Sequence, residues 1–213
     1  MSGKTLNNAE LELTQRIQLY FPRGTDLRIV QAWNGCPKNI LTEKLAEVFC
    51  QLPRPIVSIL RLISGEEVLV LDECDGSEGL ADARDMFAWI DSDFNDYGAN
   101  KKGPATGKTP VAVYEMKKDS TFSQMFGSLS SDVGKLCLTP HQIKNFVKKY
   151  RNWLQKDGYG TFFLFQSRNL FFVAGVGFSS GGGHKVGVNR FERGGVWNAE
   201  NRHRLVVPKL AAR

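Results

Sequence analysis

The stretch YGTFFLFQSRNLFFVAGVGFSSGGGHKVGVNRFE, residues 159–192, contains three apolar runs separated by the short turns SRN and SSGGG. Runs of this composition between clusters of Gly, Ser and Asn are typical of β-strands. Because short turns join antiparallel neighbours, the three runs predict an antiparallel β-meander, and RLVVPKL near the end of the chain predicts a fourth strand. Both faces of TFFLF are apolar, so this sheet is either covered on both sides or presents aromatic rings as a platform.

The segment before these strands, LTPHQIKNFVKKYRNWLQKDG, predicts an amphipathic helix over residues 140–157. Thr139 is an N-cap residue, Pro140 occupies the first helical position, and Gly158 follows the helix. One face is apolar at helical spacing and consists of Ile143, Phe146, Val147, Tyr150, Trp153 and Leu154. We therefore expect an α+β fold, with an antiparallel β-meander packed on an amphipathic helix in the C-terminal half and a mixed α/β N-terminal part.

The N-terminal part mixes helical and strand patterns without strict alternation. Residues 6–20 and the run NILTEKLAEVFCQL predict helices, and residues 26–33 predict a strand. The runs PIVSILRLI and EEVLVLD predict a hairpin around Ser64 and Gly65, and SEGLADARDMFAWI predicts a further helix. Beyond Thr109, PVAVYEM predicts a strand and STFSQMFGSL a short helix capped by Ser120.

A stretch without periodicity runs from Asp91 to Thr109 and is the best candidate for a domain boundary. It divides the chain into an acidic α+β subdomain at residues 1–97, a loop at 98–109 and a basic α+β subdomain at 110–213. The alternative is one single domain that carries this loop.

Composition indicates a globular protein, because 42% of the 213 residues are hydrophobic. The amino terminus lacks the basic start and apolar run of a secretory signal, and the longest apolar run, LFFVAGVGF, is too short for a membrane helix. The 4 cysteines form no C-x-x-C pair, which argues against a zinc ribbon and a disulfide scaffold. We expect a soluble, cytoplasmic protein with no membrane partner and no cofactor.

Charge is divided unevenly along the chain. Up to Gly107 there are 11 Lys and Arg against 16 Asp and Glu, whereas from Lys108 onward there are 17 against 6. The acids are densest between Glu66 and Asp96. The basic half suggests an anionic partner such as nucleic acid. The alternative is that the two halves dock and neutralise each other.

Two short motifs resemble catalytic sites but lack the surrounding structure that the chemistry needs. KKGPATGKTP, residues 101–110, resembles a phosphate-binding loop, but Lys102 occupies the first glycine position and a strand pattern follows where a helix is required. GFSSG, residues 177–181, has the spacing of a hydrolase nucleophile, yet it also precedes a strand pattern. Neither motif therefore predicts an enzyme.

The acidic stretch DSDFNDYG contains the pair Asp91 and Asp93, spaced like the first ligands of a calcium loop. The glycine that such a loop requires at position six is Asp96, and the glutamate at position twelve is Lys102. A polar turn at a helix end accounts for the pair more simply. A metal-dependent enzyme that uses Asp91 and Asp93 remains one alternative.

The strongest functional signal is a set of basic residues with aromatic residues near them in the sequence. We expect nucleic-acid contacts from Lys144, Lys148, Arg151, Arg202 and Arg204, with Trp197, Tyr159 or a sheet phenylalanine available for base stacking. The favoured hypothesis is a non-enzymatic binding protein whose basic C-terminal half contacts nucleic acid. A protein–protein interaction or regulatory module is the first alternative, and the metal-dependent enzyme is the second.

Overall fold

The computed structural model describes residues 58–65, 67–156, 160–179 and 181–210. All of them belong to the second of two compact units, Met1–Pro55 and Ile56–Arg213. The predicted strand at 26–33 and the helices predicted at 6–20 and in NILTEKLAEVFCQL lie outside the described residues.

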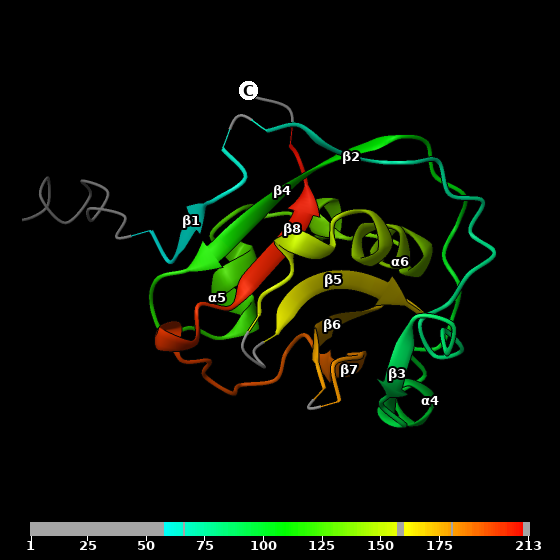
Figure 1. Cartoon of the computed structure of the whole chain (residues 1–213). Coiled ribbons are helices and arrows are strands. Elements are labelled where there is room, and N and C mark those ends of the chain that lie inside the picture. Colours follow the sequence, from blue (N-terminus) through cyan, green and yellow to red (C-terminus); the bar gives the residue numbers. More distant parts are fainter. Residues whose placement is uncertain (1–57, 66, 157–159, 180, 211–213) are drawn as a thin grey trace, which may run out of the picture. The chain divides into compact units, whose positions relative to one another are not determined.

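Eight strands form one mixed sheet in the part of the chain that the structure describes (Figure 1). In sheet order they are β1 (Leu60–Leu62), β4 (Thr109–Met116), β8 (Arg204–Pro208), β5 (Thr161–Ser167), β6 (Leu170–Phe178), β7 (His184–Arg190) and β3 (Phe87–Ile90), while β2 (Leu69–Leu71) pairs with β4 beside β1. The helices are α4 (Asp93–Asp96), α5 (Phe122–Gly127) and α6 (Pro140–Lys149), with 3-10 turns η1 (Val133–Leu136), η2 (Arg151–Trp153) and η3 (Ala199–Asn201). The sheet thus takes strands from both sides of the predicted loop at 98–109.

The predicted antiparallel meander is confirmed for three strands and wrong for the fourth. β5, β6 and β7 pair antiparallel in chain order, and Arg168 and Asn169 form the first turn with φ of 50° and 61°. Two consecutive residues with positive φ are typical of a type I′ turn. β8, by contrast, runs parallel to β5 and antiparallel to β4. A long connection precedes β8, and such a connection allows the parallel pairing that a tight turn forbids.

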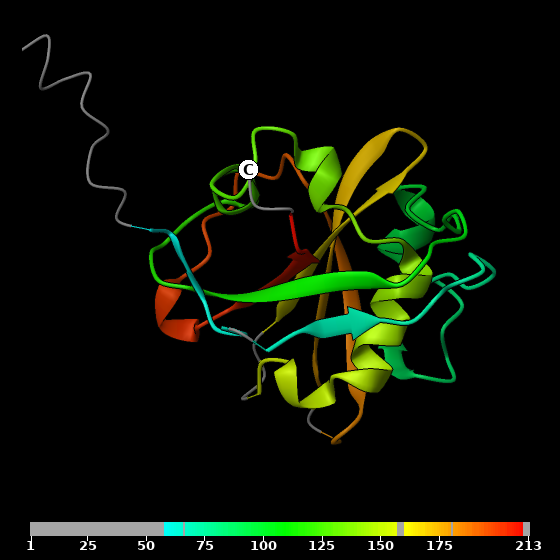
Figure 2. The ribbon, with the colours of Figure 1, turned by 90° about the horizontal axis from the view of Figure 1, so that it is seen from above.

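The sheet is covered on both faces, which decides between the two alternatives that the sequence left open. Phe163 and Phe165 of β5 face one core together with α6, and Phe162 and Leu164 face the other core together with α5. The two helices accordingly lie on opposite sides of the sheet (Figures 1 and 2). The β5 rings are fully buried and form no aromatic platform for bases.

Two local predictions before residue 100 are wrong. The first ten residues of SEGLADARDMFAWI form a loop and its last four form β3, because Leu80, Ala83 and Phe87 are buried in the core and β3 pairs with β7. Tertiary contacts thus override the helical pattern. The runs around Ser64 do not form a hairpin, since β1 and β2 both pair with β4. Between the parts of β4 that pair with β1 and with β2, the Val113 amide donates to the Ser64 hydroxyl at 3.1 Å.

Helix α6 begins as predicted and ends earlier than predicted. Thr139 caps it in a reciprocal capping box with Gln142, and Pro140 is its first residue. The helix ends at Lys149 because Tyr150 leaves helical geometry, with φ −120° and ψ 41°. The helix α5 is capped in the same way by Thr121, and not by the predicted Ser120.

Acidic side chains between residues 72 and 85 pair with α6. Lys144 Nζ contacts the carboxylates of Glu78 and Asp85, and Lys149 Nζ lies 2.6 Å from Asp72 Oδ1. Burial by itself lowers the pKa of Lys144, but hydrogen bonds to Glu78 and Asp85 outweigh it and hold the pKa above its ordinary value. Part of the basic half is therefore neutralised by the acidic segment.

We predict that Lys144→Met lowers the free energy of unfolding by about 1–3 kcal/mol, because it removes the cation that joins two carboxylates to α6. Lys148→Met is the matched control, since Lys148 is exposed on the same helix, and it should change the free energy by less than about 0.5 kcal/mol. Urea denaturation measures both values. Equal losses in the two variants would contradict the structural role of Lys144.

The loop at 101–108, which contains Gly103 and Gly107, packs against the start of α6. A Cβ atom on Gly103 would lie 2.7 Å from the Thr139 Cβ, closer than such atoms approach in proteins. The chain then enters β4 at Thr109. This strand follows the loop where a phosphate-binding loop requires a helix, in agreement with the sequence argument.

We predict that Gly103→Ala destabilises the fold by about 1–3 kcal/mol, because the added methyl group forces Thr139 and the cap of α6 to move. Gly107→Ala provides the control, since its added Cβ would meet nothing within 4 Å. Thermal unfolding should show a lower Tm for Gly103→Ala only.

Candidate functional site

The five predicted basic residues lie in different surroundings. Lys144 is buried in its ion pairs, and Arg204 is half-buried, with Nη1 donating to the carbonyl oxygens of Trp153 at 2.9 Å and Leu154 at 3.1 Å. Lys144 thus ties α6 to the acidic segment, and Arg204 ties the end of η2 to β8. Lys148, Arg151 and Arg202 are exposed.

Of these exposed residues, Arg151 lines a surface hollow. The hollow has a volume of 330 Å³ and is lined by Arg151, Asn152, Lys156 and Phe178; we call it the Phe178 hollow. Lys148 lies three residues before Arg151, close to the C-terminal end of α6. Arg202 lies apart, at the C-terminal end of η3. Arg151 therefore lies at the same hollow as a second cation, Lys156, and an aromatic ring, Phe178.

Phe178 is at the last position of β6, opposite His184 at the first position of β7. The ring centroids lie 4.8 Å apart, and His184 is buried beneath the surface. Burial, and then the positive charge of Arg151, lower the pKa of His184. Nδ1 of His184 has no hydrogen-bond partner among the described residues. This histidine is therefore neutral at pH 7 and packs against Phe178 beneath the surface.

The sequence shows Lys156 only as a basic residue that flanks Lys144, Lys148 and Arg151, and it does not single out Phe178 among the sheet phenylalanines. Phe178 is an aromatic residue that ends a strand next to a glycine-rich turn. Those signals are weak without the fold. Of the predicted stacking residues, Trp197 packs against Phe122 and Phe162 instead, and Tyr159 lies outside the described residues.

Of the GFSSG stretch, Gly177 and Phe178 end β6, and Ser179 and Gly181 lie before β7. The Ser179 hydroxyl donates to the Gly183 carbonyl oxygen at 3.1 Å. The next element after Ser179 is the strand β7, where a hydrolase nucleophile requires a helix.

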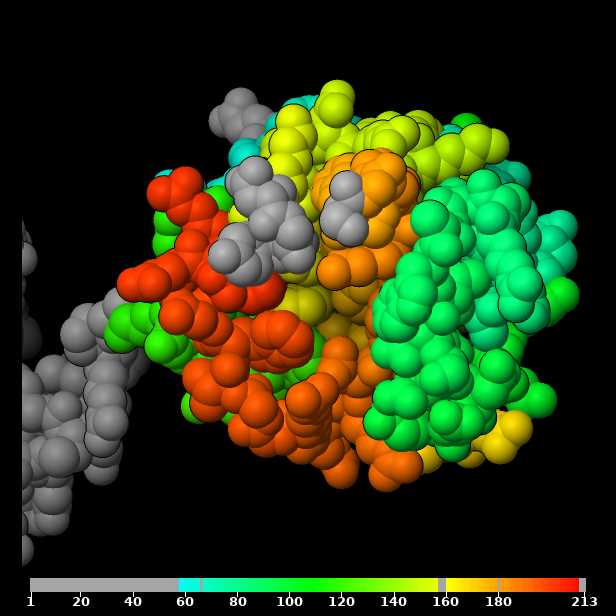
Figure 3. Space-filling model, turned by 60° about the horizontal axis from the view of Figure 1, so that its bottom comes forward, coloured from blue at the N-terminus to red at the C-terminus, as the bar shows by residue number. Residues whose placement is uncertain are grey.

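A larger hollow, of 880 Å³, contains both predicted metal residues, Asp91 and Asp93. Tyr97 and Arg190 also line it, and we call it the Asp91 hollow. Figure 3 shows α4 and the residues before it (green) beside the end of β7 (orange). Within the described residues, no group of three or more His, Cys, Asp or Glu side chains is placed to hold a metal ion.

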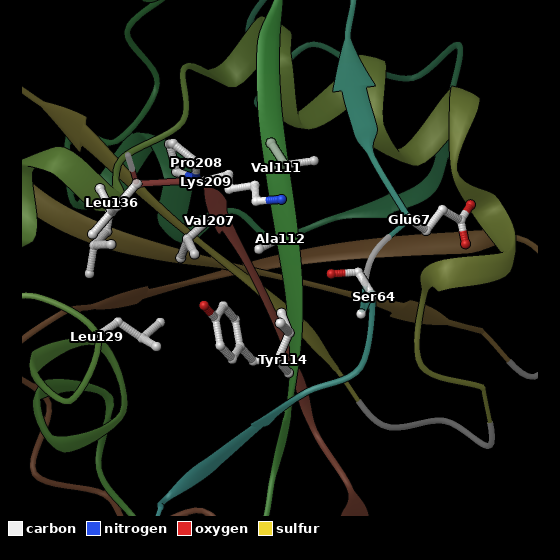
Figure 4. A pocket seen from close by; sticks show the side chains of 13 residues that line it. Ser64, Glu67, Val111, Ala112, Tyr114, Leu129, Leu136, Val207, Pro208 and Lys209 are labelled. Atoms are coloured by element: carbon white, nitrogen blue, oxygen red, sulfur yellow. The ribbon is translucent and has the colours of Figure 1, made fainter. Parts of the chain in front are cut away.

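A third hollow, of 280 Å³, lies along β4 and β8 (Figure 4). Tyr114, Leu129 and Leu136 lie on one side of β4, and Ser64 and Glu67 lie on the other. Burial raises the pKa of Tyr114. This hollow is smaller than the roughly 300–1,000 Å³ of typical ligand sites, and apolar side chains supply most of its lining.

Comparisons with known proteins give no family for this chain. No protein-family model matches it, and it has no significant match among curated proteins or solved structures. No helix in the described ranges is long and apolar enough to cross a membrane. Function therefore has to be argued from the residues themselves.

We predict that His184 makes stability depend on pH. Because its pKa is lowered in the folded state from an ordinary value of 6.5, protonation favours the unfolded state, and stability falls as the pH drops below about 6.5. This contribution has a slope of at most about 1.4 kcal/mol per pH unit. Denaturation at pH 7, 6 and 5 should show a smaller loss for His184→Gln than for the original protein. Parallel curves would contradict the assignment.

Proposed function

We propose that the chain is a non-enzymatic binding protein that contacts single-stranded nucleic acid around the Phe178 hollow. The observation that carries this proposal is the meeting of two exposed cations, Arg151 and Lys156, with the ring of Phe178 at one hollow. Proteins that bind single strands combine such cations with aromatic rings on which bases stack.

Charge supports an anionic ligand at this position. Lys148, Arg151 and Lys156 are exposed and have no ion-pair partner among the described residues, and no acidic side chain lines the hollow. Lys144, in the middle of α6, and Lys149, its last residue, are already paired with carboxylates. The available positive charge is therefore concentrated at the C-terminal end of this helix, where phosphates would gain most from it.

The aromatic ring favours single strands over duplexes. Phe178 is half-buried, so part of its ring faces the hollow while its other contacts hold it against His184. A flexible single strand can place a base on such a ring, whereas the bases of a duplex are already stacked. Asn152, in the same lining, supplies an amide for hydrogen bonds to a base or phosphate.

One observation favours the interaction-module alternative. Leu62 and Leu210 line the hollow of Figure 4 and are 46% and 40% exposed. Exposed apolar patches indicate contacts with other proteins. A Leu62→Ser/Leu210→Ser variant that keeps nucleic-acid binding would separate this surface from the Phe178 hollow.

We predict that the protein binds a fluorescent single-stranded oligonucleotide more tightly than the corresponding duplex, with affinity that falls as salt increases. Three phosphate contacts give a slope of log K against log salt of about −2. The double variant Arg151→Gln/Lys156→Gln should reduce this slope to about −0.7, and Phe178→Leu should weaken binding at least about fivefold through lost stacking. Fluorescence anisotropy over a salt series measures both effects.

Lys101→Gln/Lys102→Gln is the matched control, because it removes the same charge from two exposed residues outside the hollow. It should leave the slope unchanged. The proposal fails if the protein shows no binding at low salt, or if the two double variants lose affinity equally. The second result would indicate attraction by net charge alone.

A further inference from the structure

The Asp91 hollow is assembled from segments far apart in the sequence. Asp91, Asp93 and Tyr97 come from α4 and its flanks, the β5–β6 turn supplies Asn169, and the end of β7 supplies Arg190. None of the residues that line it lines the Phe178 hollow. At 880 Å³ it lies within the range of small-molecule sites.

Two half-buried carboxylates face this hollow. The Asp91 amide donates to the Val186 carbonyl at 3.0 Å, which ties the residue to β7, and Asp91 Oδ1 accepts from the Asp93 amide at 3.2 Å. Neither carboxylate has an ion-pair partner within 4 Å among the described residues. Both therefore keep oxygen atoms free to accept hydrogen bonds from a ligand.

Tyr97 links the carboxylates to a cation. A hydrogen bond with Asp93 raises the pKa of Tyr97, so its hydroxyl stays protonated and directed at that carboxylate. The Arg190 guanidinium lies over the Tyr97 ring at 4.9 Å from the centroid. Stacking of this kind holds a guanidinium in place while its N–H groups stay available at the edge.

Arg193 provides a second guanidinium in the same lining, and it donates to the Asn189 side chain. Both arginines are exposed, and neither has an ion-pair partner in the described ranges. Arginine side chains bind phosphate groups through paired N–H donors. The lining of the hollow thus includes both carboxylate acceptors and guanidinium donors that can bind phosphate.

The lining carries both positive and negative side chains, which restricts the kinds of ligand that can bind. A simple organic cation would meet two arginines, and a simple anion would meet the carboxylates of Asp91, Asp93 and Glu192. A ligand with hydroxyl groups and a phosphate pairs with both sets. The half-buried Phe171 adds apolar surface against which a ring can lie.

We propose that the Asp91 hollow binds a phosphorylated sugar, with hydroxyl groups donating to Asp91 and Asp93 and the phosphate bound by Arg190 and Arg193. The ligand is either a free sugar phosphate or mononucleotide, or the terminal nucleotide of a longer strand. This inference does not depend on the Phe178 hollow.

The test is isothermal titration calorimetry with ribose 5-phosphate, adenosine monophosphate, adenosine and inorganic phosphate. At least one of the two phosphorylated sugars should bind about tenfold more tightly than adenosine or phosphate, since only these ligands contact both sets of side chains. Asp91→Asn and Arg190→Gln should each weaken that binding about tenfold. Asp91→Asn retains the Oδ1 acceptor for the Asp93 amide, and Arg190 is exposed, so both variants should fold.

Asp96→Asn and Arg84→Gln are the matched controls, because both residues are exposed and neither lines the hollow. A further arm compares an oligonucleotide with and without a 5′-phosphate. If the 5′-phosphate increases the affinity for the oligonucleotide and Arg190→Gln abolishes this increase, the ligand is the end of a strand. If ribose 5-phosphate binds tightly and the 5′-phosphate has no effect on the oligonucleotide, the ligand is a free sugar phosphate. Binding of phosphate or adenosine as tight as that of both phosphorylated sugars, or no binding by any probe at about 10 mM, overturns the proposal.

The variant Arg151→Gln/Lys156→Gln leaves the Asp91 hollow intact. Titrating this variant with sugar phosphate therefore measures the Asp91 hollow separately from the Phe178 hollow. If the Phe178 hollow fails to bind oligonucleotides, the sugar phosphate titration is still interpretable, and the reverse also holds.

Discussion

Burial of β5 on both faces determines how the described part of the fold is built. Phe163 and Phe165 enter the core beside α6, and Phe162 and Leu164 enter the core beside α5. Burying each such side chain contributes about 1.5–3 kcal/mol, so together they contribute about as much as the whole net stability of a domain. A strand of this kind cannot have a solvated face. The sheet must therefore carry helices or loops on both sides, and aromatic contacts with a ligand must come from strand ends.

The same constraint explains where charge remains available. The apolar face of α6 packs inward, and two of its three lysines contact acidic side chains of the segment that follows β2. Carboxylates pair with Lys144 and Lys149. Beyond Lys149 the helix gives way to η2, and Arg151 and Lys156 have no such partner among the described residues. The division of charge along the sequence is thus partly internal docking and partly an exposed basic end of one helix.

Elements with local signals could be predicted from the sequence, and elements that depend on distant partners could not. Thr139 and Pro140 mark the start of α6, and alternating apolar runs mark β5, β6 and β7, because these signals involve neighbouring residues. The parallel pairing of β8 and the strand β3 depend on partners far along the chain. Asp91 and Asp93 were identified as candidate site residues, but the contribution of Arg190 became visible only when β7 was placed beside α4.

The two hollows lie at opposite ends of the β6–β7 pair. Phe172, which lines the Asp91 hollow, pairs with Arg190, whereas Phe178 pairs with His184. Six residues of strand at about 3.3 Å each place these positions about 20 Å apart. Sites separated by more than about 10 Å without shared contacts behave additively when mutated. A ligand the size of one sugar phosphate cannot reach both hollows, so coupling between Arg151 and Arg190 would require a longer strand that occupies both. The absence of coupling for small ligands, and its appearance with oligonucleotides, would therefore show that one strand spans the hairpin.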